Sequence, residues 1–177
     1  MENGLHGRNF PTCNAKPARI AIILINDATV RCAEVIAAGF LACANEDQLQ
    51  KIDFASLSFI SDYALSILEL SRKAPDTLLN RRNSLAILQA SRLACALWLD
   101  RARHVHIAEN LCQISKERFL QQTALYILLS KVYSPKISVM LKAWEERFIK
   151  KQLKHTERKT LVSAQSNSAR ARHELER

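Results

Sequence analysis

Apolar side chains recur along most of this chain at the spacing of α-helices. In residues 18–44 one face consists of Ile22, Ile25, Thr29, Cys32, Ile36 and Phe40. Residues three or four positions apart share a helix face, so this run predicts a strongly apolar helix. The same period predicts helices over residues 54–70 and 77–103, although the end of the first, residues 66–70, also fits a strand.

Residues that favour helix ends set the expected boundaries. Asn45 and Asp53 are each suited to cap the helix that follows, and Asp76 is suited to cap the long helix. Ser134-Pro135 predicts the start of a last helix, with Ser at the cap and Pro at the first helical position. The 177 residues include only 3 Gly and 4 Pro, so turns are few. We therefore expect a compact all-α bundle of about five to seven helices.

Charge divides the chain into unequal halves. Residues 1–71 hold five basic and eight acidic side chains, which gives a net charge of −3. Because the net charge of the whole chain is +9, the remaining residues carry +12. We predict a flexible arm over 1–17, one helical domain over 18–160 and a disordered basic tail over 161–177. Within the domain, 18–73 is expected to be an acidic half that faces a partner, and 76–160 a basic half that binds a polyanion. A solvated, arginine-rich helical surface would have the same composition.

Cysteine usage and hydropathy bear on location. The five cysteines are odd in number and form no CxxC pair, which excludes a regular disulfide framework or zinc ribbon and favours a reducing cytoplasm. The first residues contain no apolar signal-peptide core. The most apolar run, residues 20–26, is too short to span a bilayer, so we expect no membrane span.

No pattern typical of an enzyme is present. The chain lacks GxSxG, P-loop and HExxH motifs, so we predict no catalytic residues and no cofactor. His104 and His106, near Cys112, are the nearest approach to a metal site. Residues two apart on a helix point in nearly opposite directions, so these two histidines are not expected to share an ion.

Residues 107–122, IAENLCQISKERFLQQ, fit a helix-turn-helix. In that motif the second helix enters the major groove and its first residues reach base edges. The inward face expected for the second helix is Phe119, Leu120, Thr123, Ala124 and Ile127. The side chains expected to read bases are Ser115, which also caps this helix, Arg118, Gln121 and Gln122. Those expected to bind phosphates are Arg101, Arg103 and Lys116. A structural corner between two packed helices fits the same pattern.

A second basic segment lies near the C-terminus. Lys150 and Lys151 are further predicted phosphate ligands, in a run of cations that also contains Trp144 and Phe148. An anionic lipid surface is another possible partner for such a helix, and a solvated terminal helix needs no partner.

Two segments resemble subunits of the flagellar master transcriptional activator. CQISKERF, residues 112–119, resembles a polar-Gln-apolar-Ser-basic step of the C subunit, and residues 45–70 are similar in rhythm to a helical segment of the D subunit. The resemblance implies a helical activator that works with a related subunit and recruits RNA polymerase at promoters. The four-cysteine zinc cluster of the C subunit has no counterpart in this chain, so the resemblance implies no zinc site.

The sequence thus predicts a cytoplasmic regulator, an activator of transcription, that binds double-stranded DNA as a homo-oligomer or with a related helical subunit. The competing hypothesis is a helical protein–protein interaction component, such as a secretion or conjugation scaffold or a chaperone, that binds no nucleic acid.

Overall fold

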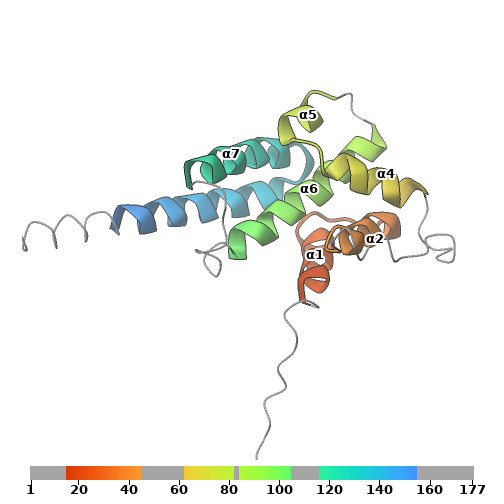
Figure 1. Cartoon of the computed structure of the whole chain (residues 1–177), viewed down its shortest axis with the longest axis horizontal. Coiled ribbons are helices and arrows are strands. Elements are labelled where there is room, and N and C mark those ends of the chain that lie inside the picture. Colours follow the sequence, from red (N-terminus) through yellow and green to blue (C-terminus); the bar gives the residue numbers. More distant parts are fainter. Residues whose placement is uncertain (1–14, 45–61, 82–83, 105–115, 155–177) are drawn as a thin grey trace, which may run out of the picture. The chain divides into compact units, whose positions relative to one another are not determined.

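The regular structure of this protein is helical. In the computed structural model, the residues described are 15–44, 62–81, 84–104 and 116–154 (Figure 1). Within these ranges there are helices and no strands, which confirms the predicted all-α fold. The chain divides into two units, Met1–Leu141 and Lys142–Arg177.

The first unit contains the labelled helices and the start of a further one. The labelled helices are α1 (Ala15–Asn26), α2 (Ala33–Leu41), α4 (Asp62–Ser71), α5 (Pro75–Leu79), α6 (Leu85–His104) and α7 (Lys116–Tyr133). The last helix covers residues 135–154, so it begins in the first unit and continues into the second.

Helix α6 is the centre of the first unit. It packs against α1, α2, α4, α5 and α7 (Figure 1). Buried side chains occur around much of its circumference. They are Ile87, Ala90, Ser91, Leu93, Ala94, Cys95, Ala96, Trp98, Leu99, Asp100 and Ala102. Four of these are alanines, and small side chains allow neighbouring helices to approach closely. A helix that is apolar on most sides is stable only when other helices cover it, which explains its central place.

The prediction of a single helix over residues 18–44 is wrong. The structure divides it into α1 and α2, and α1 already begins at Ala15, inside the predicted arm. The amides of Ala28 and Val30 bond back to carbonyls of α1, and Thr29 has a positive φ of 54°. Lys136 Nζ donates to the carbonyl of Asn26 at 2.9 Å, which satisfies an acceptor at the end of α1.

Helix α2 packs closely because of its glycine. A Cβ atom at Gly39 would lie 2.9 Å from Leu24 Cδ1 and 3.2 Å from Ile20 Cγ2, both on α1. It would also lie 3.6 Å from Leu93 Cδ1 on α6. The absence of a side chain at this position therefore lets α2 approach α1 and α6.

The boundaries around α5 and α6 also differ from expectation. The long helix predicted after Asp76 is wrong, because α5 ends at Leu79 and α6 begins at Leu85. Ser84 Oγ accepts a hydrogen bond from the amide of Ile87, which is the arrangement of an N-cap. Asp76 lies in the first turn of α5, whose N-cap is Ala74.

Two other predictions about the helices are confirmed. Residues 66–70 belong to α4, so the helical interpretation is confirmed over the strand. The last helix begins at Pro135, as predicted, but the buried Ser134 Oγ makes no hydrogen bond. The expected caps Asn45 and Asp53 lie outside the described residues.

Candidate nucleic-acid interface

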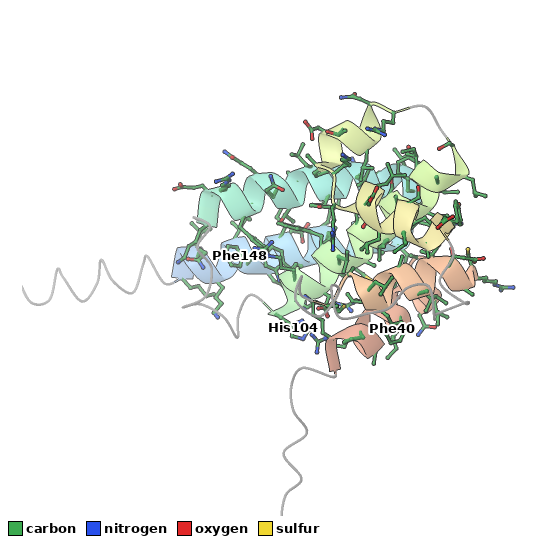
Figure 2. The ribbon with its side chains drawn as sticks, turned by 45° about the vertical axis from the view of Figure 1, so that its right-hand side comes forward. Phe40, His104 and Phe148 are labelled. Carbon is green, nitrogen blue, oxygen red and sulfur yellow. The ribbon has the colours of Figure 1, made fainter. Side chains whose placement is uncertain are left out.

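The candidate interface is the place where the end of α6 approaches the beginning of α7. We call it the α6–α7 corner and define it by Arg101, Arg103, Lys116, Arg118 and Gln121. His104 ends α6 (Figure 2). Residues 105–115, which include Ser115 and the first helix of the predicted helix-turn-helix, lie outside the described residues.

A stack of aromatic rings holds α7 against α6. The ring of Trp98 lies 4.9 Å from that of Phe119 and 4.6 Å from that of Tyr126, measured between centroids, and both pairs are nearly parallel. Trp98 Nε1 donates to Thr123 Oγ1 at 3.2 Å, and this hydroxyl donates to the carbonyl of Phe119 at 2.8 Å. Burial raises the pKa of Tyr126 to about 12, as expected for a phenol packed in this apolar layer.

The same rings position a cation at the surface. The Arg101 guanidinium carbon lies 5.3 Å from the centroid of Trp98 and 6.0 Å from that of Phe119. Cation–π attraction therefore favours this position, while the Arg101 residue remains exposed. Arg103 is also exposed, and its Nη2 lies 3.6 Å from Met140 Sδ. The structure thus places both predicted phosphate ligands of α6 at the surface, Arg101 against the first turn of α7 and Arg103 against the last helix.

The first two turns of α7 supply the other predicted side chains. Lys116, Arg118 and Gln121 are exposed, whereas Gln122 is half-buried. Glu117 is exposed as well and brings one negative charge to this turn. Together with Arg101, these turns therefore present three exposed cations with one exposed amide and one acid.

The inward face of α7 was predicted only in part. Phe119, Thr123 and Ile127 are buried, as expected, and Leu120 is half-buried. Ala124 is exposed, so its predicted inward position is wrong. Because Phe119 and Thr123 contact Trp98, their side of α7 faces inward. Ala124 lies about 100° further around the helix than Thr123, so it faces outward.

The outer face of α7 changes character along its length. Beyond Gln121 it continues with Ala124, with Leu128, which is 48% exposed, and with Val132, which is 60% exposed. Apart from Lys131 in the last turn, the exposed polar side chains of this face therefore lie in the N-terminal half of the helix.

An arginine fixes the other end of α7. Arg92 Nε on α6 donates to the carbonyl of Tyr133 at 3.1 Å. Carbonyls in the last turn of a helix lack partners within the helix, so this bond stabilises the C-terminus of α7. The arginines of α6 thus serve different purposes, since Arg92 holds the fold and Arg101 remains at the surface.

Asp100 is a buried carboxylate that the sequence reasoning missed. It is 3% exposed and lies next to the cations of the corner. Arg19 of α1 contacts both of its oxygens, with Nε 2.8 Å from Oδ1 and Nη2 3.3 Å from Oδ2. This hydrogen bonding raises the pKa of the Arg19 guanidinium above its ordinary value. The only available sequence signal was an acid within the apolar run ACALWLD.

His104 lies beside this ion pair. Its Nδ1 is 2.7 Å from the Asp100 carbonyl and 3.5 Å from Asp100 Oδ1. The Asp100 carboxylate is thus engaged with α1 and with the end of its own helix. Its negative charge faces inward, away from the solvent that Arg101 and Arg103 reach.

The second unit holds the remaining predicted phosphate ligands. Lys150 and Lys151 are exposed on the part of the last helix that begins at Lys142. Trp144 and Phe148, one turn apart, stack with their centroids 4.9 Å apart (Phe148 is labelled in Figure 2).

The described residues also bear on metal binding, on membrane insertion and on thiol chemistry. In this part of the chain no three His, Cys, Asp or Glu side chains form a group that could hold a metal ion. None of the helices described is long and apolar enough to cross a membrane. Burial raises the pKa of the Cys95 thiol, so this side chain is an inert part of the core.

The chain was compared with protein families, curated proteins and solved structures. No family model, curated protein or solved structure matches it.

Proposed function

We propose that this protein is a DNA-binding transcriptional regulator and that the α6–α7 corner contacts double-stranded DNA. The observation that carries the proposal is the position of Arg101 over the rings of Trp98 and Phe119. Because Phe119 belongs to the first turn of α7, this contact brings Arg101 close to the turn that carries Lys116 and Arg118. A concentration of exposed cations with few acids is the electrostatic footprint of a polyanion site.

The side chains of the corner would have different roles in DNA binding. Arg101, Arg103 and Lys116 would bind phosphates, which contributes affinity and orientation but no sequence information. Arg118 and Gln121, exposed on the first two turns of α7, would reach base edges in the major groove. Gln122 and Ser115 complete the predicted set, of which Gln122 is half-buried.

The wider role we propose follows the sequence resemblance. The protein would act in the cytoplasm as an activator, as an oligomer or with a related helical subunit, and it would contact RNA polymerase. This role requires binding alone, without catalysis or a cofactor.

Fluorescence anisotropy with labelled duplex DNA at several salt concentrations tests the proposal. We expect affinity to fall steeply with salt, since each phosphate contact adds about 0.9 to the log–log slope. Replacing Arg101 and Arg103 by Gln should weaken binding to all duplexes alike. Replacing Arg118 and Gln121 by Ala should abolish preference among sequences but leave much of the non-specific affinity.

A duplex pool selected by the wild-type protein provides the comparison for sequence preference. The matched control variant is Lys131→Gln, which removes an exposed cation from the far end of α7. Absence of duplex binding at low salt would contradict the proposal. Preference that survives the loss of Arg118 and Gln121 would exclude α7 as the reading helix.

A second candidate function is that of a helical protein–protein interaction component. The observation that favours it is an apolar exterior on α1 and α2, where Ile22, Ile25 and Phe40 are 57%, 50% and 47% exposed. Exposed apolar side chains on neighbouring helices are typical of surfaces that bind another protein. In a regulator the same surface would bind the partner subunit, so only the DNA titration separates the two functions.

A further inference from the structure

Four cations of the second unit share one face of the last helix. Arg147, Lys150, Lys151 and Lys154 follow each other at positions i, i+3, i+4 and i+7. Successive helical residues are about 100° apart, so these four fall within an arc of about 100°. They extend over roughly 10 Å of helix, at about 1.5 Å per residue. We call them the C-terminal basic ridge.

The ridge is exposed, and its arc contains none of the acids in the described part of the helix. All four residues are exposed, and Arg147 Nε donates to the carbonyl of Ala143 at 2.9 Å, one turn earlier in the same helix. In the described part of this helix beyond Lys142, Glu145 and Glu146 fall outside the arc when residues are placed about 100° apart, and Glu146 lies one turn before Lys150 at its edge. Four cations on one exposed face of a helix create a positive potential that attracts a polyanion.

We propose that the C-terminal basic ridge is a second nucleic-acid site, which binds the sugar–phosphate backbone of duplex DNA without reading its sequence. The inference rests on the proposed function for the choice of duplex DNA as the ligand. It goes further by assigning Arg147 and Lys154 to one surface with Lys150 and Lys151. This surface lies on a different unit from the α6–α7 corner.

The arrangement of apolar residues favours a nucleic acid over a lipid surface. Ile149 and Leu153 are 42% and 59% exposed, but their side of the helix lies about 130° from the middle of the ridge. Lys142 and Glu146 share that apolar side, so it offers no continuous apolar strip. A helix bound in a membrane interface needs a continuous apolar face on the side away from its cations. The ridge itself consists of cations alone, which suits a phosphate backbone.

The test removes the ridge charges and keeps the helix. The variant Arg147→Gln/Lys150→Gln/Lys151→Gln/Lys154→Gln uses a residue with good helix propensity, and circular dichroism verifies its fold. Anisotropy with random duplex DNA should show at least a tenfold loss of affinity at moderate salt. The log–log salt slope should become shallower by up to about 3.6, which is four contacts at about 0.9 each. Preference for the selected duplex over random duplex should remain.

A control variant of equal net charge separates a site from general electrostatics. Four exposed cations of the first unit, which lie outside the α6–α7 corner, are replaced by Gln: Arg31, Arg72, Lys73 and Lys131. This control should lose much less affinity than the ridge variant. Equal losses in both variants would overturn the ridge as a site.

The remaining outcomes distinguish this inference from the proposed function. A ridge effect without any effect of Arg118→Ala/Gln121→Ala on sequence preference supports the ridge and contradicts the corner. The reverse result overturns the ridge and supports the corner. Vesicles of phosphatidylcholine with phosphatidylserine provide the last comparison. Ridge-dependent binding to them, with no binding of the wild-type protein to DNA, would overturn the assignment to nucleic acid.

Discussion

The two sides of α6 are built in opposite ways. Toward α1 and α2, the contact includes the ion pair between the half-buried Arg19 and the buried Asp100, and the exposed surface beyond it is apolar at Ile22, Ile25 and Phe40. Toward α7, the contact is a stack of aromatic rings around Trp98, and the exposed surface at the beginning of α7 is cationic.

This difference indicates two kinds of partner for one bundle. An apolar exterior favours another protein surface, because its burial removes apolar area from water. A cationic exterior favours a polyanion. The interior contacts also contribute to stability in different ways. Loss of one partner of an ion pair leaves an uncompensated charge, whereas loss of a ring from the stack leaves a cavity, and each lowers the free energy of unfolding.

The largest effect is expected at the ring stack. Trp98→Ala should lower the free energy of unfolding by about 4 kcal/mol, because it removes a buried ring between Phe119 and Tyr126 and leaves a cavity. Urea unfolding followed by circular dichroism measures it. Trp98→Phe, which keeps a ring, should lose much less. Equal losses in both variants would show that the stack does not hold α7.

Next comes the ion pair on the opposite side of α6. Arg19→Met should lower the free energy of unfolding by about 2–3 kcal/mol, because Asp100 becomes a buried charge without its main partner. We expect less than for a fully buried pair, since the Arg19 side chain is 35% exposed. The double variant Arg19→Met/Asp100→Leu should recover most of the loss in the same measurement. A double variant less stable than Arg19→Met would contradict this interpretation.

A smaller effect is expected for the hydrogen bond within the stack. Thr123→Val keeps the shape of the side chain but leaves Trp98 Nε1 without its acceptor, so stability should fall by about 1–2 kcal/mol. Thr123→Ser retains the hydroxyl and serves as the matched control in thermal unfolding. A Ser variant as unstable as the Val variant would assign the effect to packing.

The smallest effect concerns the loop between α1 and α2. Thr29 has a φ of 54°, which is unfavourable for a β-branched residue. Thr29→Gly should therefore raise the free energy of unfolding by up to about 1 kcal/mol, the size of such backbone strain. Differential scanning calorimetry should show a higher melting temperature. A clear decrease would mean that the Thr29 Oγ1 bond to the Ala28 carbonyl outweighs the strain.

Local signals in the sequence predicted much of this fold. Apolar spacing and the low number of Gly and Pro residues predicted helices, and Ser134-Pro135 marked the start of the last one. The division of residues 18–44 was missed, because apolar residues continue across the break and the bonds that end α1 come in part from Lys136. Such contacts between distant residues leave no periodic pattern.

The candidate interface was predicted less completely. The exposed Arg118 and Gln121 follow from the helical period alone. The orientation of Arg101 depends on Trp98 and Phe119, which come together only when α6 and α7 pack. Ala124 was placed on the wrong side for the same reason, since the ring stack decides which side of α7 faces inward.

Site-specific photo-crosslinking tests the central claim most directly, because it compares the two exteriors in one experiment. A photoreactive phenylalanine analogue is placed at Gln121 in one variant and at Phe40 in another, both exposed positions. After irradiation with labelled duplex DNA, we expect a protein–DNA crosslink from position 121 and none from position 40. A crosslink from position 40 alone, or from neither position under conditions where the protein binds the duplex, would contradict the assignment of DNA to the α6–α7 corner.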